Sequence, residues 1–235
     1  MAVKRSRWVV TLAAVAGFAI TAAACHWQYD KGRRKDALLQ RMELAARQRA
    51  IDLGSHAVPE DNLYRPVTAR GVFLQHTTVL QDNQARGSRP GYVVFSALRL
   101  DEGRHVLVKR GWVEGDLDRA RLPSVSTPDG TVIVGGLALP PSGRFLEFWE
   151  TPLTAAVWQN VTVDRYGQRF GLDFQPLVLE QHSDTADGLL RDWPKPASGS
   201  AKHYGYAFQW GAMAILILVL HAIFLYRQLK KTRPA

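Results

Sequence analysis

The residues best placed to do chemistry are two histidines near the C-terminus, one before and one inside a long apolar run. The segment reads "KHYGYAFQWGAMAILILVLHAIFLYR", with His203 at its start and His221 deep within it. A histidine at membrane depth is costly and by default indicates a functional site. The two residues are five helical turns apart, so they share one helix face but lie about 27 Å from each other. They therefore cannot bind the same metal ion.

Each histidine has a structural and a functional interpretation. His221 lies near the inner end of the run, where a neutral imidazole hydrogen-bonds to headgroups or to a neighbouring helix. His203 is followed by Tyr206 and Trp210, and such residues form the usual aromatic belt at a membrane interface. The alternative for His203 is an axial ligand of a haem at the outer membrane face, with Tyr206 and Trp210 against the macrocycle.

Two long apolar runs predict two membrane-spanning helices, over residues 8–26 and 204–226, because each is close to the ~20 residues that cross a bilayer. Basic residues precede the first run and follow the second, so the positive-inside rule places both termini in the cytoplasm. The expected order is a cytoplasmic N-terminus at 1–7, the two spans with an outer domain over 27–203 between them, and a cytoplasmic tail at 227–235. The small residues of "TAAAC" leave a cleaved signal peptide as the alternative for the first run.

The charge, cysteine and motif content excludes several classes of protein. The net charge of +9 is concentrated in the flanks of the spans, and no nucleic-acid-binding motif is present, so we attribute the charge to membrane topology and lipid contact. Cys25 is the only cysteine, which excludes an internal disulfide and a Cys-x-x-Cys metal site. Hydrolase and P-loop patterns are absent, so no catalytic residue is assigned and no enzyme is expected.

The middle of the chain predicts an α+β domain of mainly antiparallel strands. A charged amphipathic helix is expected over 35–53, at the start of the domain. The runs "GYVVFSALRL" and "RHVLVKRGWV" flank the short turn Asp101-Glu102-Gly103 and predict a hairpin. The segment "TPLTAAVWQNVTVD" predicts a short helix entering a strand. A partly closed sheet or small barrel is expected, because it protects the strand edges.

Two local features concern packing. Gly111 and Trp112 end the second hairpin strand, where the glycine allows a bulge or a close backbone approach. The large apolar ring of Trp112 is either buried in the core or docks a partner. Small residues at four-residue spacing in the first apolar run, and further small residues in the second, predict that the two helices pack closely, which brings His26 near His203.

Several motifs resemble the surfeit-locus protein one (SURF-type) family of cytochrome c oxidase assembly factors. The segment "CHWQYDKGRRKDALL" is similar to the Trp-Gln and basic residues that end the family's first span, and "RGWV" is similar to the end of its hairpin. The segments "VWQN" and "RDWP" match later markers, and "KHYGYAFQW" resembles the signature His-x-x-Tyr-Ala-x-x-Trp. The resemblance covers nearly the whole chain and favours a retained first span.

The resemblance implies an assembly factor, not an enzyme, in the inner (plasma) membrane with its main domain in the periplasm. It implies transient binding of haem a for insertion into the largest subunit of the terminal oxidase, with His203 as the axial ligand and no metal beyond the haem iron. Haem a synthase and membrane lipids are further expected partners. His26 does not match a family histidine and is not assigned as a second ligand. Two alternatives remain: a scaffold that stabilises an oxidase subunit without haem, and an unrelated envelope enzyme.

Overall fold

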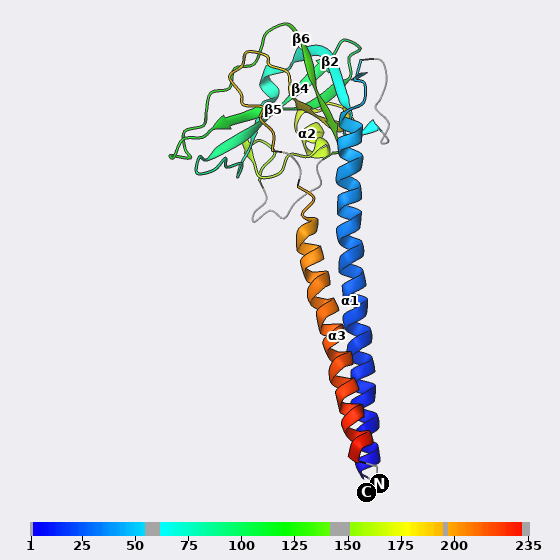
Figure 1. Cartoon of the computed structure of the whole chain (residues 1–235). Helices are drawn as coiled ribbons and strands as arrows, with labels where there is room; N and C mark the ends of the chain where they lie inside the picture. The colour runs from blue at the N-terminus through cyan, green and yellow to red at the C-terminus, as the bar shows by residue number, and fades with distance from the viewer. Residues whose placement is uncertain (1, 55–61, 142–150, 195–196, 232–235) are drawn as a thin grey trace. The chain divides into compact units, whose positions relative to one another are not determined.

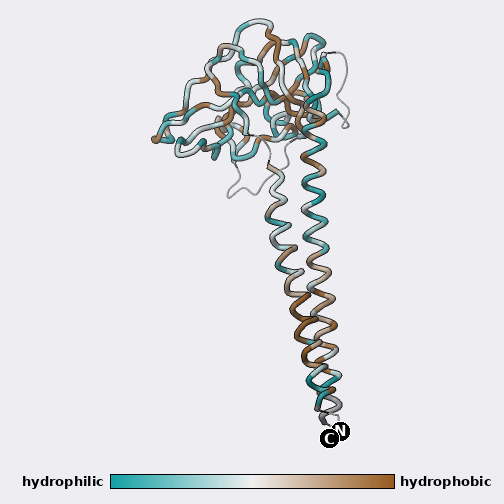
Figure 2. The backbone as a smooth tube through the Cα atoms, in the orientation of Figure 1, coloured by the Kyte–Doolittle hydropathy of each residue, from teal (hydrophilic) through white to brown (hydrophobic). Residues whose placement is uncertain are grey.

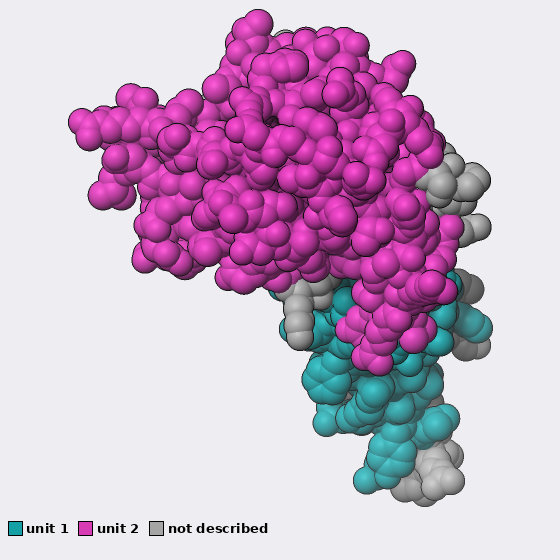
Figure 3. Space-filling view, turned by 90° about the horizontal axis from the view of Figure 1, so that it is seen from above, with its two compact units in different colours: residues 1–41, 195–235 teal, residues 42–194 magenta. Residues whose placement is uncertain are grey.

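The computed structural model describes the whole chain apart from residues 1, 55–61, 142–150, 195–196 and 232–235. The chain divides into two compact units, shown in different colours in Figure 3. The first unit combines residues 1–41 with residues 195–235, and the second consists of residues 42–194. Segments from both ends of the chain therefore form one unit, and the middle of the chain forms the other.

The first unit is a pair of antiparallel helices, made of α3 (Ser200–Lys231) and most of α1 (Ala2–Ala46) (Figure 1). Both helices are long and apolar enough to cross a membrane, judged by length and composition. Their hydrophobic residues lie at the same level of the pair in Figure 2. Because the helices are antiparallel, the start of α1 and the end of α3 lie at the same end of the pair.

Helix α1 is continuous, which corrects the prediction of a first span followed by a separate helix over 35–53. No proline interrupts the helix, and Gly32 is accommodated beneath the ring of Tyr204, where an added Cβ would lie 2.9 Å from the ring. The helix also ends earlier than predicted, at Ala46, and Ile51–Asp52 form the short strand β1 instead.

The second unit is built on one mixed sheet that closes on itself. Strand β2 pairs with β6 and also with β4, which completes a ring in the order β2-β6-β8-β5-β4. The remaining strands extend the sheet outside this ring. The predicted small barrel is thus confirmed as a closed, barrel-like sheet. Its strands are β2 (Pro66–Phe73), β3 (Val79–Gln81), β4 (Gly91–Leu100), β5 (His105–Glu114), β6 (Thr131–Leu139), β7 (Val157–Trp158) and β8 (Phe174–Gln181).

Two glycines allow the ring to close. A Cβ at Gly71 of β2 would lie 2.2 Å from the carbonyl oxygen of Arg99 in β4. A Cβ at Gly136 of β6 would lie 1.9 Å from the carbonyl oxygen of Glu180 in β8. No side chain fits at such distances, so the close approach of these strands depends on glycine.

The predicted hairpin is confirmed, because β4 and β5 pair antiparallel around the turn at 101–103. Its ladder contains a bulge: Val94 opposes Gly111 and Phe95 opposes Lys109, which leaves Arg110 as the extra residue. A bulge re-aims the side chain that it carries. Strand β4 is buried on both faces, with one face toward the interior of the barrel and the other toward helix α2.

Helix α2 (Val163–Phe170) covers the outer face of the barrel through its buried Tyr166, whose hydroxyl donates to the carbonyl oxygen of Thr77. The helix starts at Thr162, whose side chain accepts from the amide of Arg165 at 3.3 Å. Strand β7 precedes this helix, so the predicted order of a helix followed by a strand is reversed. The strand ends at Trp158, and the N-cap threonine at 162 sets the start of the helix after it.

Candidate functional site

His203 lies in the first turn of α3 and contacts α1 through Gln28, with 2.8 Å between Nδ1 of the imidazole and Oε1 of the carboxamide. A carboxamide oxygen only accepts hydrogen bonds, so Nδ1 donates and carries the proton of the neutral imidazole. The lone pair is then on Nε2, for which the described part of the chain provides no partner. Histidines that bind metals have this arrangement: a hydrogen bond orients one ring nitrogen, and the lone pair of the other is available to the metal.

The protonation state of His203 also leaves the lone pair available. Burial lowers the pKa of His203, and the ammonium groups of Lys35 and Lys31 lower it further. Because the pKa is shifted below its ordinary value of about 6.5, the imidazole is mainly uncharged at neutral pH. The uncharged form is the one that ligates metals.

Asp36 of α1 holds the first turn of α3, which carries His203, through a hydrogen bond to Tyr204. The hydroxyl of Tyr204 donates to Oδ2 of Asp36 at 2.8 Å. Hydrogen bonds from Ser200 and then Tyr204 lower the pKa of Asp36, against the smaller opposing effect of burial. The Tyr204 ring packs on Tyr29 of α1, with the ring centroids 5.8 Å apart. Both helices therefore restrain the backbone next to His203.

The two other predicted site residues of α3 lie on the same stripe as His203, because they follow it by three and seven positions. Tyr206 is 53% exposed, and Trp210 is partly buried. The helix thus places a histidine and two aromatic rings on one face. Contact of these rings with a macrocycle stays a prediction.

The two other histidines of the helix pair do not contribute the hydrogen bond to His203. His26 is exposed on α1, and the partner of His203 on that helix is Gln28. Two residues further along, the helix has turned by about 200°, and this rotation brings Gln28 to His203 instead. His221 stacks on Phe224 of its own helix, with ring centroids 6.1 Å apart.

Small residues bring the two helices close together, as the sequence predicted. A Cβ at Gly17 would lie 3.4 Å from the side chain of Ile217, and a Cβ at Gly211 would lie 3.4 Å from Sγ of Cys25. Ala207 is buried on the same face of α3. This close approach places Gln28 within hydrogen-bond distance of His203.

Gly111 and Trp112 lie in the barrel unit, in strand β5. A Cβ at Gly111 would lie 2.6 Å from Cβ of Leu189, so the glycine allows the chain to pass at that point. Trp112 is only 2% exposed, and its Nε1 donates to the carbonyl oxygen of Gln84 at 2.5 Å. The guanidinium of Arg86 covers the ring, 5.1 Å from its centroid. These contacts favour the core interpretation of Trp112 over the docking one.

A buried ionic network, not predicted from the sequence, lies next to Trp112. Arg110, the bulge residue, is fully buried, and its Nη2 donates to Oδ2 of Asp187 at 2.8 Å. Nη2 of Arg191 donates to both carboxylate oxygens of Asp187, at 2.6 and 2.7 Å. The available signal was the arginine in each of "RGWV" and "RDWP", because the network joins these two motifs through Asp187.

We expect this network to make the stability of the barrel unit pH-dependent. Burial raises the pKa of Asp187, but hydrogen bonds from Arg191 and Arg110 outweigh it, so the folded-state pKa lies below the ordinary value of about 3.9. Such a carboxylate contributes stability above its unfolded pKa and loses it as the pH falls toward the folded pKa. The melting temperature, followed from pH 7 down to pH 3, should therefore fall less steeply in Asp187→Asn than in the natural protein.

The control for this titration is Asp184→Asn, which changes a mostly exposed carboxylate 3.4 Å from Arg191. It should retain the natural dependence of melting temperature on pH. An Asp187→Asn protein with the natural slope would show that Asp187 does not carry the acid sensitivity.

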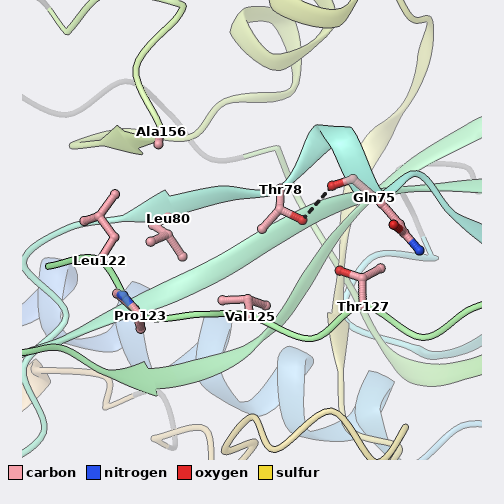
Figure 4. A pocket seen from close by; sticks show the side chains of 8 residues that line it. All are labelled: Gln75, Thr78, Leu80, Leu122, Pro123, Val125, Thr127 and Ala156. Carbon is pink, nitrogen blue, oxygen red and sulfur yellow. Dashed lines mark hydrogen bonds between the residues drawn. The ribbon is translucent and has the colours of Figure 1, made fainter.

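A pocket of about 350 Å³ lies beside β3 in the barrel unit (Figure 4). The hydroxyl of Thr78 donates to the carbonyl oxygen of Gln75 at 3.3 Å, and the hydroxyl of Thr127 accepts from Nη1 of Arg110 at 2.9 Å. We assign no chemistry to it, because no side chain that lines it is titratable. The lining residues are Gln75, Thr78, Leu80, Leu122, Pro123, Val125, Thr127 and Ala156.

Comparison with known proteins shows the family of the chain. The model of the SURF1 family matches residues 15–215. The chain belongs to the SURF1 family. A SURF1-like protein of Rickettsia bellii (strain RML369-C) is 24% identical over 205 residues, which cover 84% of this chain and 83% of the relative. A SURF1-like protein of Rickettsia conorii (strain ATCC VR-613 / Malish 7) is 22% identical over 214 residues, which cover 88% and 87%. The SURF1 match includes both Gln28 and His203, and it confirms the resemblance found in the motifs.

Proposed function

We propose that this SURF1-family protein is an assembly factor of the haem–copper terminal oxidase that binds haem a through His203 and hands it to the largest oxidase subunit. The SURF1 family is known broadly for oxidase assembly, which supports the first part of the proposal. The observation that carries the second part is the pair of Gln28 and His203, 2.8 Å apart, which leaves Nε2 free. The proposed role is binding and transfer, without catalysis.

The residues around His203 fit a haem by the chemistry of their side chains. Haem iron accepts an imidazole nitrogen as an axial ligand, and the hydrogen bond to the other nitrogen sets the ligand's orientation and basicity. Tyr206 and Trp210 would cover part of the apolar macrocycle, and Asp36 would keep the helix turn in place through Tyr204. Haem a synthase is a candidate donor of the haem, and membrane lipids surround the helix pair.

The proposal is tested by purifying the full chain from cells that make haem a and recording its absorption spectrum. We expect a haem a spectrum in the purified protein. Purified protein without pigment, from cells in which it is needed for oxidase maturation, would instead favour a membrane-anchored scaffold that stabilises an oxidase subunit.

We further propose that the helices cross the inner membrane, with both termini in the cytoplasm and residues 27–203 in the periplasm. The antiparallel helix pair supports this proposal, because the start of α1 and the end of α3 lie at one end of it. Basic residues flank the apolar runs at that end, as the positive-inside rule requires.

Reporter fusions test this topology. A fusion at Pro128 should have periplasmic-type activity, and a fusion at Ala235 should have cytoplasmic-type activity. Cytoplasmic-type activity at Pro128 would contradict the proposed orientation.

A further inference from the structure

The sequence segment "DKGRRKD" places four basic residues in α1 just beyond Gln28, and two of them lie on the His203 side of the helix. Lys31 and Lys35 follow Gln28 by three and seven positions, so the three side chains form one stripe. The neighbouring stripe holds Asp36, which contacts Tyr204 instead. The basic segment is therefore divided between two flanks of the helix pair.

The electrostatics of the site support this division. The charges of Lys35 and Lys31 both act on the imidazole of His203. The charge of Arg33 acts instead on the hydroxyl of Tyr204. Two cations thus share the flank of the helix pair that carries His203, and a third lies on the other flank.

The two lysines are free to bind an anion. Both side chains are exposed, and no carboxylate of the described residues forms an ion pair with either. Nζ of Lys31 lies 4.7 Å from the ring centroid of Trp27, and Nζ of Lys35 lies 3.7 Å from the position of a Cβ at Gly199. By contrast, Arg34 of the same segment is paired with Asp30 at 2.6 Å.

The antiparallel packing gives this flank a polar end and an aromatic end. Along α1, Lys31 and Lys35 lie about 4.5 and about 10 Å beyond Gln28, in the direction away from the apolar run. Along α3, Trp210 lies about 10 Å from His203 in the opposite direction, into the apolar run. A ligand on His203 would therefore meet ammonium groups at one edge and aromatic rings at the other.

We propose that Lys31 and Lys35 bind the propionate carboxylates of a haem ligated by His203, an inference that rests on the proposed function. A haem has this polarity, because its two carboxylates lie on one edge and the rest of the macrocycle is apolar. Ammonium groups and carboxylates form charge-assisted hydrogen bonds. The lysines would thus fix which edge of the haem faces the water and which edge faces the hydrocarbon.

The test uses the full chain in a neutral detergent, with ferric protoporphyrin IX and its dimethyl ester as probes. The ester lacks the two negative charges but keeps the iron and the ring. We expect the natural protein to bind the free acid about tenfold more tightly than the ester in titrations of the Soret band. The double variant Lys31→Gln/Lys35→Gln should lose this preference, with its affinity for the ester and its iron-ligand spectrum unchanged.

The matched control is Arg33→Gln, which removes one positive charge on the Tyr204 flank of the same helix. It should keep the preference for the free acid. Equal affinities of the natural protein for the acid and the ester, both weakened by His203→Ala, would overturn the role of the lysines but leave the haem ligand intact. Affinities unaffected by His203→Ala would overturn the proposed function and this inference with it.

Discussion

Replacing Trp112 by alanine is expected to lower the free energy of unfolding of the barrel unit by about 3–5 kcal/mol, the usual cost of removing a large aromatic side chain from a core. The ring is 2% exposed and contributes an Nε1 hydrogen bond to Gln84. The chain is also built around it, because a Cβ at Gly91 would lie 2.2 Å from the ring. Chemical unfolding of the full chain, followed by near-UV circular dichroism, measures the effect.

Two further variants of the barrel unit serve as comparisons for the loss of stability in Trp112→Ala. Leu117→Ala removes a side chain that is 89% exposed and should change stability by less than about 0.5 kcal/mol. Trp112→Phe should fall between alanine and the natural residue, since it restores most of the ring but not the hydrogen bond. A Trp112→Ala protein that stays as stable as the natural one, yet no longer co-purifies with the oxidase, would show that Trp112 docks a partner.

Replacing His203 by alanine is expected to have the second large effect, a loss of most of the oxidase-bound haem a in membranes. The variant removes the imidazole that Gln28 holds by a hydrogen bond and that we propose as the haem ligand, and it costs little stability because the residue is only partly buried at the end of a helix. His221→Ala is the matched control, since it removes a histidine of the same helix five turns away. Oxidase haem a, measured in membranes with equal amounts of each variant, should fall much less in His221→Ala.

A variant of Gln28 distinguishes ligation of haem by His203 from the orientation of its imidazole. Gln28→Ala keeps the imidazole of His203 but removes its hydrogen bond, so it should weaken haem binding by about 10- to 100-fold, as loss of such an orienting partner does elsewhere. The effect should appear in the affinity and not in the identity of the iron ligand. An unchanged affinity would show that the contact with Gln28 does not prepare His203 for ligation.

The parts of the fold that the sequence predicted are those with a local signal. Alternating apolar residues around the turn at 101–103 predicted the β4–β5 hairpin, and the two apolar runs predicted α1 and α3. The closed ring depends on the pairing of β2 with β4 and on close contacts such as that of Gly71, which no local pattern encodes. Likewise, residues 35–53 have a helical pattern, but the pattern does not reveal that the helix continues from the first apolar run.

In the candidate site, too, residues with a local sequence signal could be predicted, and contacts set by the packing of distant segments could not. His203 was predicted from its residue type and its place before an apolar run. Its partner Gln28 belongs to the segment "CHWQYDKGRRKDALL", but the register of two packed helices decides which residue of α1 meets His203, and that register is not local. Arg110 and Asp187 are harder to predict, because Asp187 belongs to neither motif and the two residues, 77 positions apart, meet only in the folded barrel unit.

The most direct test of the central claim is the absorption spectrum of His203→Ala beside that of the natural protein, both purified from cells that make haem a. The amounts of membrane-inserted protein must be equalised before the spectra are recorded. We expect haem a bands in the natural protein and their loss in His203→Ala. A full pigment spectrum in His203→Ala at equal protein level would contradict it, and the aromatic residues around His203 would then be an interfacial belt.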